Sequence, residues 1–302
     1  MVKILVCDKI HEEGLNLLRE AGFDVDEKLD LKPEELEKIA RDYDALIVRS
    51  RTKVTKDVVP ENSRVKVIGR VGVGVDNIDA EVIKRTKVLT SPEAVTDAVA
   101  ELTIGLMIAV ARQIPLADSA LKKGEWLKSK IMGRQLQGQT LGVIGFGRIG
   151  SRVAKIAKTL GMNILAYDPF MNEAALKEVG GKAVSLEELL RNSDIITLHA
   201  TLLPETYHMI GEKEFAMMKD GVIIINIARG ALIDEKALYK ALKTGKVAGA
   251  GLDCHETEPP TNLELAKLPN VVCTPHIGGQ TEEAQRNASV LIAHKIIDFF
   301  RK

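Results

Sequence analysis

The chain has 302 residues, which is enough for two compact domains or one large one. Lysine plus arginine and aspartate plus glutamate both number 42, so no overall basic field draws the protein to nucleic acid or to a membrane surface. Three scattered cysteines are few for a disulfide framework or a thiolate metal site, and we expect neither. We expect them to be packing residues in a reducing compartment, and we expect no metal.

Apolar runs alternate with helical patterns along the front of the chain, as in α/β domains with parallel sheets. The amino terminus reaches Asp8 before a signal-peptide core could form, which favours a cytoplasmic location. Helices are predicted at 11–22, ended by a glycine, and at 32–42, where Pro33 occupies a tolerated first-turn position. Five runs predict strands: VKILVCD, FDVDEKL, ALIVRS, VKVIGRVGVG and KVLTSP.

The most apolar segment, AVAELTIGLMIAVA at 98–111, has 14 residues and includes Glu101. It is shorter than the ~20 residues that a bilayer needs. We therefore predict one buried helix from Asp97 to about Lys123, packed between domains or subunits. This buried helix favours a homodimer.

The alternation restarts at Thr140, with short runs rich in valine and isoleucine that are typical of strands covered on both faces. The predicted fold class is therefore α/β with two doubly wound parallel sheets. An amphipathic helix at 281–300 would return to the first domain. We assign residues 1–97 plus 280–302 to one domain and 98–279 to the other. Six runs predict the second sheet: LGVIGFG, NILAYD, DIITLHA, VIIINIA, VAGAGLD and NVVCTPH.

Gly145, Gly147 and Gly150 form a G-x-G-x-x-G turn between a predicted strand and a predicted helix. Such glycines permit a tight turn, backbone approach to a pyrophosphate, and close helix–strand packing. Asp168 ends the next strand and can accept hydrogen bonds from a ribose, and the next basic residue is Lys177, so the pattern favours NAD over NADP. A glycine-rich structural turn with a strand-capping aspartate is the alternative.

Three side chains follow later strands, at the sheet edge where α/β folds bind ligands: Arg229, Glu258 and His276. A 2-keto acid that accepts a hydride needs a fixed cation and a proton donor, which a guanidinium and an imidazole supply. Glu258 would orient the imidazole and raise its pKa. Taken singly, the three also suit a surface ion pair, a solvated acid and a strand cap.

His199 also follows a strand, and no acid lies near it in the sequence. We expect it to line the cofactor pocket with Thr201 and Thr206, and His255 is a weaker rival for the proton donor because the loop offers no second fixed partner.

GFGRIG with Asp168, then NIARG, TEPP and TPHIGG resemble the D-isomer-specific 2-hydroxyacid dehydrogenases, in that order and at that family's spacings. The resemblance covers nearly the whole chain. IVRSRTKVT, GRVGVGVDNID, ARQIP and TPHIGGQTEEAQ are similar more particularly to members that act on phosphoglycerate. The resemblance implies a flavodoxin-like substrate domain, a Rossmann NAD-binding domain, and NAD as cofactor.

By this resemblance Arg229 would bind the substrate carboxylate and keto oxygen, His276 would be the acid/base, and Glu258 its partner. Residues implied to contact NAD lie at its pyrophosphate and at its nicotinamide end: Arg148 and Ile149, then Ile227, Ala228, Asp253, Gly278 and Gly279.

The resemblance also implies that the backbone at Val73 and Gly74 meets the substrate carboxylate, and that Arg49 and Arg70 bind a phosphate. Lys128 is a further candidate for the phosphate, whereas the neighbouring Arg51 equally suits a solvated charge.

Two departures from the family pattern are the absence of asparagine in SPEAV and Thr201 in place of a frequent proline. The chain ends after its last predicted helix, so we expect no C-terminal regulatory domain. The expected activity is NAD-dependent oxidation of phosphoglycerate. Reduction of glyoxylate or hydroxypyruvate, and a non-catalytic NAD sensor, are the alternatives.

Overall fold

The computed structural model describes residues 1–301. The chain forms two compact units, of which unit 1 comprises Met1–Thr96 with Gly279–Lys302 and unit 2 comprises Asp97–Gly278. The boundary between them falls within helix α4 (Pro92–Ala111).

Unit 1 contains a five-stranded sheet in the order β2-β1-β3-β4-β5, and every pair in it is parallel. This is the flavodoxin-like order. Each strand falls inside a run predicted from the sequence. The strands are β1 (Lys3–Val6), β2 (Asp24–Glu27), β3 (Ala45–Val48), β4 (Val67–Arg70) and β5 (Lys87–Thr90).

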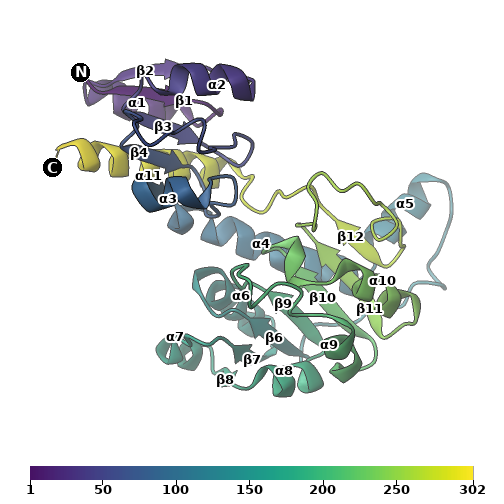
Figure 1. The fold of residues 1–302 in the computed structure, drawn as a ribbon. Coiled ribbons are helices and arrows are strands. Elements are labelled where there is room, and N and C mark those ends of the chain that lie inside the picture. Colours follow the sequence, from purple (N-terminus) through teal and green to yellow (C-terminus); the bar gives the residue numbers. More distant parts are fainter. Residues whose placement is uncertain (302) are drawn as a thin grey trace. The chain divides into compact units, whose positions relative to one another are not determined.

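The C-terminal helix completes unit 1, because α11 packs against α1 and β4 (Figure 1). A Cβ on Gly14 of α1 would lie 2.8 Å from the backbone of Ser289 of α11, so a glycine is needed at this helix crossing. The short helix α3 was not predicted. The helices of unit 1 are α1 (Glu12–Glu20), α2 (Pro33–Ala40), α3 (Ala80–Arg85) and α11 (Glu282–Arg301).

Unit 2 contains a seven-stranded parallel sheet in the order β12-β11-β10-β9-β6-β7-β8. Counted from β6, this is the Rossmann order, and it reverses between β6 and β9. The sequence missed β8, a two-residue strand too short to show a pattern. The strands are β6 (Thr140–Ile144), β7 (Asn163–Tyr167), β8 (Lys182–Ala183), β9 (Ile195–Leu198), β10 (Val222–Asn226), β11 (Val247–Leu252) and β12 (Val271–Cys273).

The α/β class with two parallel sheets, predicted from the sequence, is confirmed. The helices of unit 2 lie on both faces of its sheet (Figure 1). They are α6 (Arg148–Thr159), α7 (Glu173–Glu178), α8 (Leu186–Asn192), α9 (Glu212–Met217) and α10 (Glu235–Lys243), together with most of α4 and all of α5 (Ile114–Lys122).

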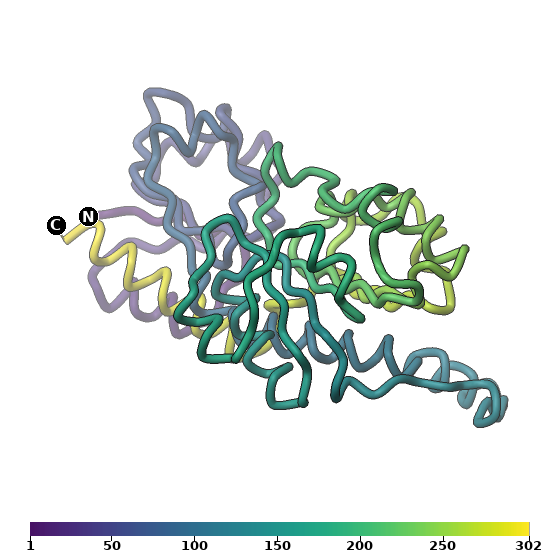
Figure 2. Tube along the Cα trace, turned by 90° about the horizontal axis from the view of Figure 1, so that it is seen from below, coloured from purple at the N-terminus to yellow at the C-terminus, as the bar shows by residue number. Residues whose placement is uncertain are grey.

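The prediction of a single helix from Asp97 to about Lys123 is wrong, because the helix is interrupted between α4 and α5. Gln113 adopts a left-handed conformation with φ 52°, and Pro115, which has no backbone N–H, lies in the first turn of α5. Beyond α5 the chain continues as an arm that projects from unit 2 and returns toward β6 (Figure 2).

Helix α4 is longer than the 14-residue apolar segment suggested, since it has 20 residues. Its length and composition would suffice to cross a membrane, but 56% of its most apolar window is buried inside the protein. The glycines of β11 make room for it: a Cβ on Gly249 would lie 2.7 Å from Val110, and one on Gly251 3.0 Å from Leu106. These contacts make α4 a core helix of unit 2.

Candidate active site

The glycine turn joins β6 to α6 at the point where the strand order reverses. Gly145 has φ 88°, and a Cβ there would lie 2.6 Å from the backbone of His199 and Ala200. A Cβ on Gly150 would lie 2.1 Å from the Gly145 carbonyl oxygen. A Cβ on Gly147 would meet nothing within 4 Å. The turn therefore has no room for a side chain at Gly145 or at Gly150, but it has space at Gly147. Gly147 directly precedes α6, and the amino terminus of a helix favours an anion.

Asp168 directly follows β7 and lies against this turn. Its Oδ2 accepts a 2.7 Å hydrogen bond from the Phe146 N–H, and its Oδ1 accepts one of 2.8 Å from the Phe170 N–H. A carboxylate oxygen accepts more than one hydrogen bond, so both oxygens retain capacity for ribose hydroxyls. Asp168 thus fixes the turn and remains suited to bind the ribose.

The next loop follows β9, the strand beside β6 at the place where the strand order reverses. Burial lowers the pKa of His199 to about 3, and its Nε2 lies 2.9 Å from Thr197 Oγ1. His199 is therefore neutral near pH 7 and unsuited to donate a proton. The Thr206 hydroxyl accepts from the Leu203 N–H and donates to the Thr201 carbonyl, both at 2.7 Å, which closes this loop.

Arg229 is positioned by two neighbours that the sequence reading missed. The buried Asn226, the last residue of β10, donates from Nδ2 to the Arg229 carbonyl at 2.9 Å and accepts from the Ala228 N–H at 3.1 Å. A Cβ on Gly230 would lie 1.9 Å from the His255 carbonyl carbon. Only a glycine after the arginine lets the loop that carries Glu258 pass this close. The glycine in NIARG was the available signal.

His276 and Glu258, 18 residues apart in sequence, form an ion pair in which Nδ1 lies 2.8 Å from Oε2. His276 has φ 54°, so its backbone needs support. That support comes from Asp253, whose carbonyl accepts from the His276 N–H at 2.9 Å. The buried Asp253 carboxylate also accepts from the N–H groups of Ile277 and Gly278, both at 2.8 Å.

The resemblance assigned Asp253 and Gly278 to the nicotinamide end of the cofactor. In the structure the Asp253 carboxylate is occupied by the His276 loop, including a 2.5 Å bond from Thr274 Oγ1. Asp253 therefore holds the turn that carries His276.

The other residues implied to contact NAD lie in several places. Ile227 and Ala228 precede Arg229 directly, whereas Gly279 belongs to unit 1. Arg148 and Ile149 begin α6 after the open Gly147.

The pKa of His276 is raised to about 10 by its hydrogen bonds with Cys254 and with Glu258. Burial raises the pKa of the Cys254 thiol, which is therefore neutral near pH 7, so the charge that stabilises the imidazolium is the Glu258 carboxylate. Burial of Glu258 opposes its ionisation, but hydrogen bonds from His276 and from the His255 N–H outweigh it and lower its pKa. At neutral pH the pair is an imidazolium beside a carboxylate.

In unit 1, Arg49 and Arg70 stand at the carboxyl ends of the neighbouring strands β3 and β4, where Val48 pairs with Arg70. Arg49 Nη2 donates to the neutral Gln280 side chain at 3.2 Å. The Arg70 guanidinium lies against Gly72, since a Cβ there would be 1.6 Å from Nη1. Val73 and Gly74 follow at once, and Val73 is 41% exposed. The structure thus brings Arg49 and Arg70 to one edge of the sheet.

Arg51 has a structural role. Its Nε donates to Asp8 Oδ1 at 2.9 Å, and it also bonds Asp30 and the Cys7 carbonyl. The buried Asp8, which the sequence reading did not single out, also accepts from the Arg49 N–H at 2.6 Å. Lys128 is exposed on the arm between α5 and β6.

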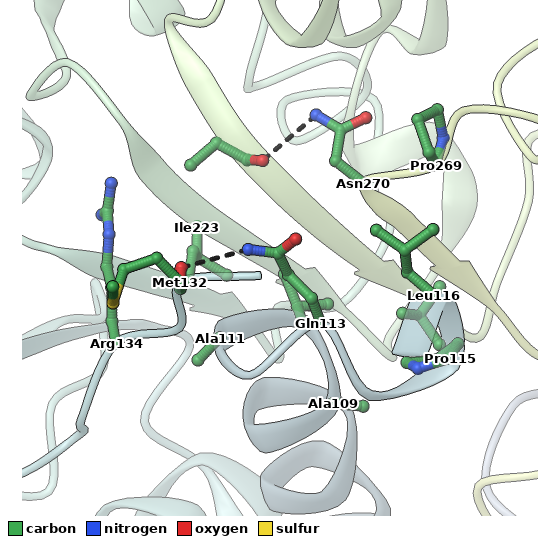
Figure 3. Close-up of a pocket in the computed structure, with 13 residues that line it drawn as sticks. Ala109, Ala111, Gln113, Pro115, Leu116, Met132, Arg134, Ile223, Pro269 and Asn270 are labelled. Atoms are coloured by element: carbon green, nitrogen blue, oxygen red, sulfur yellow. Dashed lines mark hydrogen bonds between the residues drawn. The ribbon is translucent and has the colours of Figure 1, made fainter. Parts of the chain in front are cut away.

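A pocket in unit 2 lies at the opposite edge of its sheet (Figure 3). Ile223 and Ala248, near the starts of β10 and β11, line it together with the hydrogen-bonded pair Gln113 and Met132. The glycine turn, Arg229 and His276 all follow the carboxyl ends of strands, where parallel sheets bind ligands. This pocket is therefore not part of the candidate active site.

Residues 104–278 match the family profile described as D-isomer specific 2-hydroxyacid dehydrogenase, NAD binding domain. The chain belongs to the D-isomer-specific 2-hydroxyacid dehydrogenases. NAD is the cofactor, and unit 2 contains the whole matched segment.

The chain is 50% identical to D-3-phosphoglycerate dehydrogenase of Methanocaldococcus jannaschii, over 98% of its own length and 57% of the relative's. It therefore spans little more than half of that enzyme. It is 44% identical to glyoxylate reductase of Thermococcus litoralis, over 98% of this chain and 93% of the other. The crystal structure of Aquifex aeolicus D-lactate dehydrogenase with NAD and lactic acid matches with TM-score 0.88 and 32% identity, over 99% and 95% of the two chains.

The glycine turn gives a first prediction. Gly150→Ala should lower both thermal stability and NAD affinity, because its Cβ would clash with the Gly145 carbonyl. Gly147→Ala should keep the melting temperature, because its Cβ meets open space, yet weaken NAD binding by about tenfold. Thermal unfolding and fluorescence titration measure the two effects. Gly105→Ala, an exposed helical glycine whose Cβ also meets nothing, is the control. Wild-type NAD affinity in Gly147→Ala would contradict the assignment.

The raised pKa of His276 gives a second prediction. With His276 as the expected proton donor in the reduction of a 2-keto acid, kcat/KM should stay level above neutral pH and fall as the pH rises through about 10. Glu258→Gln removes the charge that stabilises the imidazolium and should move this fall to lower pH. Glu256→Gln, two residues away and paired with His208, is the matched control. If kcat/KM of Glu258→Gln falls at the same pH as that of the wild type, this carboxylate does not set the pKa of the proton donor.

Proposed function

We propose that this protein oxidises D-3-phosphoglycerate with NAD to 3-phosphohydroxypyruvate, the first step of serine synthesis. The observation that carries the proposal is the 2.8 Å pair of His276 and Glu258, held beside the Arg229 loop in an NAD-binding domain. A positioned acid/base and a fixed cation are what a 2-hydroxy acid requires.

His276 would take the proton of the substrate hydroxyl, and Glu258 would stabilise the resulting imidazolium. Arg229 would hold the carboxylate and the developing keto oxygen, since its planar guanidinium suits two oxygens at once. Bound NAD supplies the acceptor for the hydride of C2, with its pyrophosphate at Gly147 and its ribose at Asp168. Since His276 is protonated at neutral pH, oxidation should become faster as the pH rises, and reduction should be favoured below.

The phosphate is assigned to Arg49 and Arg70. Both lie at the carboxyl edge of the sheet of unit 1, and in a chain with no net charge they form a local basic pair. The neighbouring Arg51 is held by Asp8 and is left out of this assignment. The identity to the phosphoglycerate dehydrogenase of M. jannaschii supports the same substrate.

Reduction of glyoxylate or hydroxypyruvate is the second candidate, because Arg229, Glu258 and His276 would serve any small 2-keto acid. The match to the T. litoralis glyoxylate reductase, which spans 93% of that enzyme, favours it. A non-catalytic NAD sensor is a weaker hypothesis, because a protein that only binds NAD does not need a fixed imidazolium–carboxylate pair.

Selective loss of the phosphorylated substrate tests the assignment. Arg49→Ala and Arg70→Ala should each lower kcat/KM for 3-phosphohydroxypyruvate by about 10- to 100-fold, since a hydrogen bond to a charged group is worth ~1.5–3 kcal/mol. Glyoxylate has no phosphate, so its kcat/KM should change by less than about threefold. The assay is oxidation of NADH in the presence of each acid.

Arg19→Ala is the matched control for these variants, because Arg19 pairs with Glu27 on the surface of unit 1. An equal loss with both acids would point to glyoxylate or hydroxypyruvate as the substrate. Failure of the wild type to turn over any 2-keto acid would favour the NAD sensor.

We also propose that two copies form a homodimer through the arm of unit 2. Large apolar side chains are exposed along α5 and this arm: Ile114 is 47%, Leu121 60%, Trp126 76% and Met132 87% exposed. Apolar side chains gathered in this way mark association surfaces. Sedimentation velocity should show a dimer at micromolar concentration, and Trp126→Glu should shift it toward monomer. A wild-type monomer would contradict the proposal.

A further inference from the structure

Cys254 lies against the His276–Glu258 pair, although the sequence reading treated it as a packing residue. Its Sγ, a carboxylate oxygen of Glu258 and a ring nitrogen of His276 all lie within 4.8 Å of one another. The sulfur is also 3.4 Å from the Ala228 carbonyl oxygen. Cys254 is 2% exposed, whereas the side chains of His276 and Glu258 are 45% and 40% exposed. The sulfur is therefore the buried member of this group, and the imidazole and the carboxylate are the members that contact solvent.

Thiolate, imidazole and carboxylate are the three ligand types that zinc prefers. Bonds of ~2.3 Å to sulfur and ~2.0–2.2 Å to nitrogen and oxygen place tetrahedral ligand atoms about 3.3–3.6 Å apart. The present spacing within 4.8 Å is compatible with this, provided that the 2.8 Å contact between Nδ1 and Oε2 opens by roughly half an ångström. Both side chains are partly exposed and have room to move by that amount.

We propose that Cys254, Glu258 and His276 form an inhibitory binding site for Zn²⁺ and similar thiophilic divalent cations. Binding replaces the thiol proton and the imidazolium proton, which both pass to solvent, and forms bonds to Sγ, to the ring nitrogen and to a carboxylate oxygen. A water completes the fourth position. The inhibition rests on the proposed function, because an imidazole bound to the metal is neutral and a far weaker acid than the imidazolium that reduction needs. The binding does not rest on it.

The ligand set also predicts which ions bind. Mg²⁺ and Ca²⁺ prefer oxygen ligands and should leave the group unchanged, whereas Zn²⁺, Cd²⁺ and Co²⁺ accept sulfur and nitrogen. A second group of possible ligands in unit 2, His208, Asp234 and Glu256, contains no sulfur. Asp234 Oδ1 there already caps α10 by accepting from the N–H groups of Lys236 and Ala237. The presence of sulfur therefore separates the two groups in an experiment.

Cobalt absorption tests the binding directly on the whole, untagged chain. Co²⁺ bound to a thiolate gives a charge-transfer band in the near ultraviolet, which nitrogen and oxygen ligands do not give. Titration of the wild type should produce this band with one ion per chain, and Zn²⁺ should abolish it. Cys254→Ser should lose the band. Cys273→Ser, which removes another partly buried thiol outside the group, should keep it. A band that persists in Cys254→Ser would overturn the proposal.

Inhibition is measured separately, as the Zn²⁺ concentration that halves each variant's own rate of 2-keto acid reduction. This concentration should rise at least tenfold in Cys254→Ser and stay unchanged in Cys273→Ser, and Mg²⁺ should not inhibit. Equal sensitivity of wild type and Cys254→Ser would refute an inhibitory site at Cys254. If the chain reduces no 2-keto acid at all, the proposed function fails, and the cobalt band still decides whether the metal binds.

Discussion

The contact between the His276 imidazole and the Glu258 carboxylate depends on residues outside the pair. Asp253 holds the left-handed turn at His276, and Gly230 lets the loop that carries Glu258 pass against the Arg229 backbone. Because the strands of unit 2 are all parallel, these loops leave the sheet at the same edge. The raised pKa of the imidazole follows from this arrangement, so the acid/base chemistry is a property of the loop packing as much as of the two side chains.

Local patterns predicted every strand except β8, the glycine turn with Asp168, and the candidates Arg229, Glu258 and His276, because strand ends and tight turns are set by nearby residues. Gly230 and Asp253 were missed as supports because their partners lie on other loops. Asn226 was missed because it bonds backbone groups of Ala228 and Arg229, and such bonds leave no pattern in the sequence. The proximity of Cys254 to His276, 22 residues later, was equally invisible. The break between α4 and α5 had a local signal in Pro115, which the apolar pattern outweighed.

The two sheets place their candidate binding residues in the same way, at the carboxyl ends of parallel strands. In unit 2 the carboxyl edge offers an open glycine turn and an acid/base pair, whereas in unit 1 it offers two guanidinium groups. Buried aspartates organise both edges, since Asp253 holds the His276 loop and Asp8 holds the segment after β3. A carboxylate buried with several donors fixes loop geometry more firmly than a surface ion pair does.

The close passage at Gly230 ties the loop of Arg229 to the loop of Glu258, so neither can shift without displacing the other. Mutations that alter the reacting groups are therefore expected to be costly, while those at Arg49 and Arg70 fall on the sheet of the other unit. Under the proposed assignment of the phosphate to these arginines, changes in unit 1 alone would exchange one acid for another. Diversification of acid preference without loss of the proton-transfer chemistry follows from that separation.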